Sequence, residues 1–300
     1  MSRRKSGVSV HGILLLDKRL AVSSNKALQE VKRLFNANKA GHTGNLDLLA
    51  SGLLPLCFGE ATKVSGLMLD DDKRYLVDVK LGVMTNTGDL EGEVIASKPV
   101  PSLTDEQVKT CLEYFTGEIE QVPPMHSALK FNGKKLYELA RDGIEIERKA
   151  RCIRIYELKL ISRTVDVLTL EVFCSKGTYI RSLAEDIGHY FECGGTVTML
   201  RRLQSGIFDL AQAYTLEQLV EMTDEQRLAC LLPVDAPLRD LPIVYLSEVQ
   251  AKAISYGQSV DYSGLHQKSV RLYDKELFLG LGEIGLNGKL CPKRLFDLNN

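Results

Sequence analysis

The chain has 300 residues, a formal net charge of −1 and hydrophobic residues at 44% of its composition. A chain of this length has room for a large core, and we expect one large domain followed by a smaller one. The ordinary composition excludes a disordered or fibrous protein, and the near-neutral charge does not by itself indicate a nucleic-acid partner. No apolar segment approaches the roughly 20 residues of a membrane span, so we expect no association with a membrane.

Basic residues and cysteines add to this picture. Lys and Arg greatly outnumber Asp and Glu in residues 1–40, and further basic clusters lie at 130–135 (KFNGKK), 148–154 (RKARCIR) and 200–203 (LRRL). Such asymmetry allows a polyanion to bind one face, although charged runs more often form solvated surface. The seven cysteines are scattered and never form a C-x-x-C pair, which favours reduced thiols in a cytoplasmic protein. The basic start is followed by only a short apolar run, so we expect no signal peptide.

The first part of the chain predicts a strand, a helix, a loop and a second strand. The apolar run at 12–18 (GILLLDK) predicts a buried strand. Apolar residues at helical spacing within 23–36 predict a helix behind a Ser/Asn cap. Residues 41–55 (GHTGNLDLLASGLLP) are expected to form a loop, because their glycines are unfavourable inside a regular element. Alternation in 74–82 (RYLVDVKLG) predicts a strand whose apolar face opens with Tyr75.

The rest of the chain continues to mix strands and helices. Residues 131–143 predict an Asn-Gly turn and a short amphipathic helix, which together form an arm standing off the body. A strand at 167–177 runs into a helical stripe with Thr178 as its cap. After a boundary near residue 242, residues 243–300 predict a small β-rich domain with tight turns. Strands separated by helices, with hairpin signals between them, favour an α+β fold over a doubly wound parallel sheet.

Most catalytic motifs are absent or lack the context that they need. GLGEIG (280–285) matches G-x-G-x-x-G and would suggest a nucleotide-dependent oxidoreductase, but a hairpin turn follows it where the motif requires a helix. The five histidines are far apart and no metal-ligand spacing occurs, so we expect no metal site. No G-x-S-x-G or Walker A motif is present.

Asp47 is the candidate that remains. An arbitrary aspartate in a glycine-rich stretch is most often a turn or cap residue. Here Gly41 and Gly44 allow the backbone to approach a ligand, and the apolar run after Asp47 places its carboxylate at the edge of an apolar region. An ionised carboxylate in that position needs a cationic partner, and residue spacing alone does not identify the arginine that supplies it.

Several long motifs resemble one known family, the bacterial TruB-type tRNA pseudouridine-55 synthases. The resemblance rests on GILLLDK, on 37–63 (ANKAGHTGNLDLLASGLLPLCFGEATK), on 122–143 (VPPMHSALKFNGKKLYELARDG), on 174–188 (CSKGTYIRSLAEDIG) and on 198–206 (TMLRRLQSG). These motifs occur in the family's order and cover essentially the whole chain.

The resemblance implies an architecture and an activity. It implies a mixed, largely antiparallel central sheet flanked by helices in a catalytic domain at 1–242, with a flexible RNA-gripping thumb at about 121–152 and a PUA-like domain at 243–300. It implies an isomerase that flips the T-loop uridine-55 of tRNA, breaks its C–N glycosidic bond, rotates the uracil and rejoins it through carbon. No cofactor is implied, and the partner is the tRNA T-arm. We expect a cytoplasmic monomer with no obligate protein partner.

The resemblance also assigns residues. Asp47 matches the essential aspartate and Arg181 the arginine that pairs with it. Tyr75 matches the tyrosine that stacks on the target base and is a candidate for handling the proton at the base carbon. Three further positions match substrate-binding residues: His42, which fills the gap left by the flipped uridine, and Tyr179 and Leu200, which line the base pocket.

Some positions depart from the family pattern. The segment LDPLATG reads LDLLASG here, so Leu48 replaces a proline and Ser51 a threonine. Losing that proline is expected to loosen the loop beside Asp47. Other departures are Arg19 for Pro, Ala21 for Gly, Asn86 for Asp and His126 for Tyr. A second function remains open at this point, namely a tRNA-binding and folding chaperone in which catalysis is dispensable, because refolding RNA needs the basic face but not Asp47.

Overall fold

The computed structural model describes residues 7–127 and 129–298. The basic residues at positions 3–5 and Ala128 of the expected thumb therefore lie outside the described residues. Within the described part, no helix is both long and apolar enough to cross a membrane, and the seven cysteines are free thiols.

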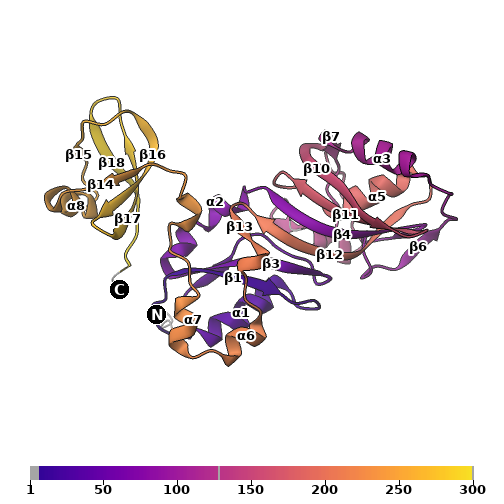
Figure 1. Ribbon diagram of the computed structural model, residues 1–300, viewed down its shortest axis with the longest axis horizontal. Helices are drawn as coiled ribbons and strands as arrows, with labels where there is room; N and C mark the ends of the chain where they lie inside the picture. Colours follow the sequence, from indigo (N-terminus) through magenta and orange to yellow (C-terminus); the bar gives the residue numbers. More distant parts are fainter. Residues whose placement is uncertain (1–6, 128, 299–300) are drawn as a thin grey trace.

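The described residues form an α+β fold around one large sheet, which curves through the main body in Figure 1. This sheet has the order β1-β3-β12-β4-β11-β10-β7, with β2 beside β3 and β13 beside β12. Strand β12 pairs in parallel with β3 and in antiparallel fashion with β4, and the remaining pairings are antiparallel. The expected mixed, largely antiparallel sheet is therefore confirmed. The strands are β1 (Gly12–Lys18), β2 (Ala40–His42), β3 (Ala50–Phe58), β4 (Lys73–Leu81), β7 (Gly117–Gln121), β10 (Arg151–Arg163), β11 (Val167–Cys174), β12 (Gly195–Ser205) and β13 (Phe208–Asp209).

Two hydrophobic clusters lie on one face of this sheet. One cluster packs α3 (Asp105–Tyr114) and α5 (Ile180–Tyr190) on β4, β10 and β11, and the other packs α1 (Ser24–Leu34) and α6 (Leu216–Glu221) on β1 and β3. Tyr75 of β4 and Leu200 of β12 contact both clusters. These two residues therefore lie where the two hydrophobic clusters meet.

Local chemistry explains where the main helices begin. Ser23 caps α1, because its hydroxyl accepts a hydrogen bond from the Lys26 N–H at 3.2 Å, as the sequence predicts. The prediction that Thr178 caps α5 is wrong: the N-cap is Tyr179, and the Thr178 hydroxyl donates to the Ser175 carbonyl instead. The buried Gln121 side chain compensates by accepting from the Tyr179 N–H and donating to the Tyr179 carbonyl.

The predicted loop over 41–55 is shorter than expected. Strand β2 includes Gly41, and β3 already begins at Ala50 and includes Gly52. Gly52 has φ +99°, and a side chain there would clash with the backbone of Arg202 on the neighbouring strand. Gly52 therefore allows two strands to approach closely. The sequence pattern alone does not distinguish such a glycine from one in a turn.

Smaller elements surround the sheet. A hairpin joins β8 (Lys130–Phe131) to β9 (Lys134–Lys135) and runs into α4 (Leu136–Arg141), as the Asn-Gly turn predicts. The other peripheral elements are β5 (Val83–Thr85), β6 (Val94–Ser97), α2 (Ser65–Leu69) and α7 (Asp224–Ala229).

A second sheet, drawn in yellow in Figure 1, stands apart from the main body and contains the C-terminal strands. Its order is β14-β16-β17-β18-β15, from β14 (Ile243–Tyr245), β15 (Val260–Asp261), β16 (Gln267–Asp274), β17 (Leu277–Ile284) and β18 (Lys289–Leu295), with α8 (Glu248–Ser255) beside it. Phe278 and Phe296 pack into a core shared with β1 and β3, and Arg271 pairs with Asp235 at 3.0 Å. Gly280 and Gly282 lie inside β17, so GLGEIG is part of a hairpin rather than a dinucleotide fingerprint.

Candidate active site

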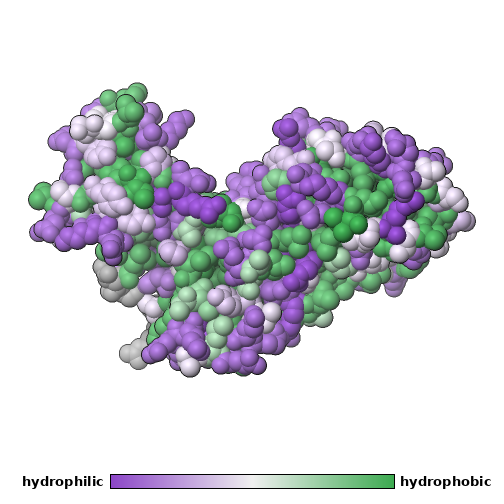
Figure 2. All heavy atoms as spheres, in the orientation of Figure 1, coloured by the Kyte–Doolittle hydropathy of each residue, from purple (hydrophilic) through white to green (hydrophobic). Residues whose placement is uncertain are grey.

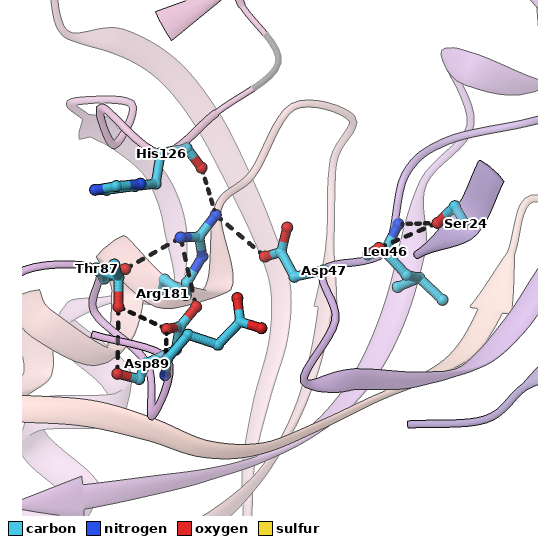
Figure 3. Close-up of polar contacts among 8 residues, drawn as sticks. Ser24, Leu46, Asp47, Thr87, Asp89, His126 and Arg181 are labelled. Atoms are coloured by element: carbon cyan, nitrogen blue, oxygen red, sulfur yellow. Dashed lines mark hydrogen bonds and ion pairs between the residues drawn. The ribbon is translucent and has the colours of Figure 1, made fainter. Parts of the chain in front are cut away.

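Asp47 lies in the loop between β2 and β3, and hydrogen bonds hold the loop on both sides of it. The Ser24 hydroxyl donates to the Leu46 carbonyl at 3.1 Å and accepts from the Leu46 N–H at 2.8 Å (Figure 3). The Leu48 carbonyl accepts from the Ala21 N–H at 2.9 Å, and the Asp47 carbonyl accepts from the Ala50 N–H at 3.1 Å. The loop thus has anchors in α1, in the turn after β1 and in β3, although Leu48 replaces the proline of the family pattern.

Arg181 extends from the first turn of α5 toward Asp47. Its Nη2 lies 3.1 Å from Asp47 Oδ2, and its side chain is only 8% exposed. The same guanidinium donates to the Thr87 carbonyl at 3.1 Å and to the His126 carbonyl at 2.7 Å. Figure 3 shows these contacts converging on the guanidinium, with the His126 ring pointing away from it. The backbone, rather than the side chain, of His126 holds Arg181.

Asp89 is a site residue that the sequence reasoning missed. Its Oδ2 lies 3.5 Å from Arg181 Nη1, and its side chain is only 5% exposed. The Thr87 hydroxyl and the Glu91 N–H both donate to Asp89 Oδ1, at 2.6 and 3.0 Å. In the sequence Asp89 follows a Thr-Gly pair and looks like an ordinary turn residue, so only its three-dimensional position identifies it.

Burial and charge act against each other on Asp47. Burial raises the pKa of Asp47 above its ordinary value, the Arg181 charge lowers it, and the nearby Asp89 charge raises it. Lys18, which is 1% exposed in β1, also favours the ionised form of Asp47. Burial lowers the pKa of Lys18 to about 8. Arg181 is therefore the main group that keeps the Asp47 carboxylate ionised in an apolar setting.

A cavity of about 660 Å³ opens beside this ion pair, a size typical of small-molecule sites. All six residues singled out from the sequence line it: His42, Asp47, Tyr75, Tyr179, Arg181 and Leu200. The structure thus brings together residues from β2, β4, β12, the Asp47 loop and the start of α5. Asp89 and Glu91 complete the wall near Arg181.

The aromatic and imidazole groups of the cavity have identifiable neighbours. The Arg151 guanidinium stacks on the Tyr179 ring with 4.9 Å to the ring centroid. The Nδ1 of His42 lies 3.1 Å from the Gly44 carbonyl oxygen, so this nitrogen donates. Burial lowers the pKa of His42, which makes it a neutral group at pH 7 rather than a cation.

The segment after β7 also reaches the cavity. Lys135, Tyr137 and Arg141, from β9 and α4, line it as well. Both cations lie over the Tyr137 ring, with Lys135 Nζ at 5.3 Å and Arg141 Cζ at 5.5 Å from its centroid. This segment therefore presents positive charge and an aromatic face to any anionic ligand that enters.

Two departures from the family pattern differ in their local effect. Ala21 adopts φ 58°, a left-handed conformation that costs a residue with a side chain about 1–2 kcal/mol. Asn86 uses its amide oxygen to accept from the Glu93 N–H at 3.0 Å, a role that an aspartate oxygen would fill equally well.

Comparisons with known proteins identify the family and the fold. The family model for the TruB family pseudouridylate synthase (N terminal domain) matches residues 32–180, and the tRNA pseudouridylate synthase B C-terminal domain matches 181–239. The C-terminal model of pseudouridine synthase II TruB matches 242–296. Two solved structures share the fold. A Cbf5-Nop10-Gar1 complex matches with a TM-score of 0.72 and 23% identity, covering 96% of this chain and 84% of that chain. An H/ACA RNP bound to a substrate RNA matches with a TM-score of 0.73 and 20% identity, covering 100% of this chain and 92% of that chain.

Curated relatives match nearly the full length. Proteins named tRNA pseudouridine synthase B from Chromohalobacter salexigens and Mannheimia succiniciproducens are each 49% identical to this chain. The first alignment covers 99% of this chain and 98% of the relative, and the second covers 99% and 100%. The chain belongs to the TruB family of pseudouridylate synthases.

Proposed function

We propose that this chain isomerises uridine-55 in the T-loop of tRNA to pseudouridine, with Asp47 as the reacting carboxylate. Family membership and full-length relatives named tRNA pseudouridine synthase B support the activity and the tRNA substrate. The observation that carries the proposal for this chain is the Asp47–Arg181 pair at 3.1 Å, at the wall of a cavity that Tyr75 also lines.

The cavity contains the groups that such a reaction requires. An ionised carboxylate can act as a nucleophile or stabilise positive charge at the sugar when the glycosidic bond breaks, and Arg181 keeps Asp47 in this form. Tyr75, Tyr179 and Leu200 present aromatic and apolar surface against which an extruded uracil can stack. Taking a base out of a hairpin loop costs a few kcal/mol, and these contacts offset that cost.

Other residues fit the recognition of folded RNA. His42 is neutral and lines the cavity, and we propose that it fills the space left by the extruded uridine. Lys135 and Arg141, in the proposed thumb at about 121–152, can bind phosphates, which would make RNA binding weaken as salt increases. We further propose a catalytic domain at 1–242 and an RNA-binding domain at 243–300, acting as a cytoplasmic monomer.

The test uses a T-arm hairpin whose position-55 uridine carries tritium at C5 of the base. Joining C5 to the sugar must release this tritium, so the wild type should release it and Asp47→Asn should not. Glu91→Gln removes a different carboxylate from the same cavity and leaves the Asp47–Arg181 pair intact, so it serves as the matched control. Absence of release by the wild type would refute the activity, and equal release by Asp47→Asn would refute the role of Asp47. If Asp47→Asn is inactive but still binds and refolds tRNA, a chaperone function coexists with catalysis.

A further inference from the structure

Four positions in register cross the centre of the main sheet next to the Asp47 loop. Lys18 of β1 is opposite Gly52 of β3, Gly52 is opposite Arg202 of β12, and Arg202 is opposite Tyr75 of β4. Paired residues on neighbouring strands project from the same face of a sheet. The Arg202 side chain therefore lies between the backbone at Gly52 and the side chain of Tyr75.

Arg202 is a buried cation that has no acidic partner among the residues that the structure describes. It is 1% exposed, and its Nε donates to the Leu53 carbonyl at 2.7 Å. Among the described residues it forms no ion pair, and its buried Nη2 has no hydrogen-bond partner. Burying a charge without a counter-ion costs several kcal/mol. Although Arg202 belongs to the basic cluster at 200–203, its burial means that it is not part of a basic surface.

The surrounding backbone leaves room for this arginine. Gly52 has φ +99°, and a Cβ there would clash with the Arg202 carbonyl oxygen. A Cβ on Gly44, in the loop that carries Asp47, would lie 3.3 Å from Arg202 Nη1. The guanidinium is thus enclosed between the sheet and the Asp47 loop, with Tyr75 beside it.

The Tyr75 hydroxyl is the ionisable group beside this guanidinium. Burial raises the pKa of Tyr75, whereas the positive charge of Arg202 lowers that pKa. Cys174 and Asp47 also face Tyr75, and both oppose the ionisation of its hydroxyl. The Arg202 charge in turn disfavours protonation of Lys18, Lys73 and His42.

We propose that Arg202 is a positioning residue for Tyr75, whose free guanidinium N–H groups hold the Tyr75 oxygen at the cavity wall and stabilise the phenolate that accepts the C5 proton of the rotated uracil. This inference rests on the proposed function. As the C5–H bond breaks, its electron pair restores the C5–C6 double bond and the proton passes to the Tyr75 oxygen, which changes from phenolate to phenol. The phenol later releases this proton to water and N1 of the uracil takes one up, so the isomerisation consumes no net proton or electron.

The first experiment needs no RNA. Tyr75 is replaced by 3,5-difluorotyrosine, whose hydroxyl titrates nearer neutrality, and the ¹⁹F shift is followed against pH in otherwise wild-type protein, in Arg202→Lys and in Arg202→Met. We expect the hydroxyl to titrate about one pH unit or more higher in Arg202→Met, with Arg202→Lys in between. Identical titration in the three proteins would overturn the proposal, whether or not the chain is active on RNA.

The second experiment measures single-turnover tritium release from the C5-labelled hairpin. We expect Arg202→Met to slow release at pH 7 by about 10- to 100-fold, because each unit of pKa changes the phenolate fraction tenfold. The rate of tritium release by Arg202→Met should continue to rise with pH where the wild-type rate no longer changes. Arg202→Lys should restore part of the lost rate. In a Tyr75→Phe background, Arg202→Met should have little further effect.

Arg201 provides a matched control on the same strand. Its guanidinium pairs with Asp17 at 2.6 Å and donates to the Ser51 hydroxyl, away from Tyr75. Arg201→Met should therefore leave the ¹⁹F titration and the pH dependence of release unchanged, even if it lowers stability. An equal shift in both arginine variants, or full additivity of Arg202→Met with Tyr75→Phe, would overturn the proposal. Absence of release by the wild type would refute the proposed function, while the titration would still test Arg202.

Discussion

Asp89 offers the sharpest test of how the ion-pair network works. Asp89→Asn keeps the shape of the side chain and the acceptor oxygen that receives hydrogen bonds from Thr87 and Glu91. It removes the negative charge 3.5 Å from Arg181. Two consequences follow, one for stability and one for the ionisation of Asp47.

The stability change is bounded by what Arg181 retains. Breaking a buried ion pair completely costs about 3–5 kcal/mol, whereas a hydrogen bond to a charged group contributes about 1.5–3 kcal/mol. Arg181 keeps Asp47 and two backbone carbonyls, so we expect the free energy of unfolding to fall by about 1.5–3 kcal/mol. Urea denaturation at pH 7 measures this change. The exposed Glu91 forms no ion pair with Arg181 within the described residues, so Glu91→Gln should change stability by about 0.5 kcal/mol or less.

Asp89→Asn should also favour the ionised form of Asp47. The Asp89 charge raises the pKa of Asp47, so its removal should lower that pKa. The acidic limb of tritium release should therefore move to lower pH in Asp89→Asn, even though the pH-independent rate falls about tenfold or more as Arg181 loses its orientation. An acidic limb that stays in place or moves to higher pH, together with unchanged stability, would refute this account of the network.

Three further changes probe the fold around the site. Ala21→Gly relieves the φ of 58° and should raise the free energy of unfolding by about 0.5–1 kcal/mol, as urea denaturation would show; lower stability would contradict the strain. Burial raises the pKa of Glu185 from 4.5 to about 6. The protonated Glu185 therefore contributes stability to the folded state that is fully present below pH 4.5 and is lost as the pH rises through 6. Glu185→Gln should therefore stabilise the protein at pH 7.5 by at most about 2 kcal/mol more than at pH 4.5, and an equal effect at both pH values would exclude this origin. Gly52→Ala should lower the thermal midpoint of unfolding by several degrees, because the added Cβ would clash with the backbone of Arg202. An unchanged midpoint would contradict the close approach of β3 and β12.

The sequence predicted the elements better than it predicted the network between them. Strand and helix patterns at 12–18, 74–82 and 178–191 correspond to β1, β4 and α5, because apolar periodicity reports directly which side of an element is buried. The six candidate site residues meet in one cavity, but the resemblance to a family, rather than any spacing, connected Asp47 with Arg181.

Residues whose roles depend on long-range register could not be predicted in this way. Asp89 looks like a turn aspartate, and Arg202 looks like part of a basic surface cluster, until strand pairing places one beside Arg181 and the other beside Tyr75. Gly52 likewise looked like a loop residue, because the sequence shows that a glycine is present but not which backbone lies against it.

The most direct test of the central claim compares two full-length tRNA transcripts that differ only in the position of the label. One carries tritium at C5 of uridine-55, and the other carries it at C5 of a uridine elsewhere in the same T-loop. We predict that the wild-type chain releases tritium from the first transcript alone and converts uridine-55 to pseudouridine, with no release by Asp47→Asn. Release from the second transcript, or none from the first, would contradict the claim that this site acts on uridine-55.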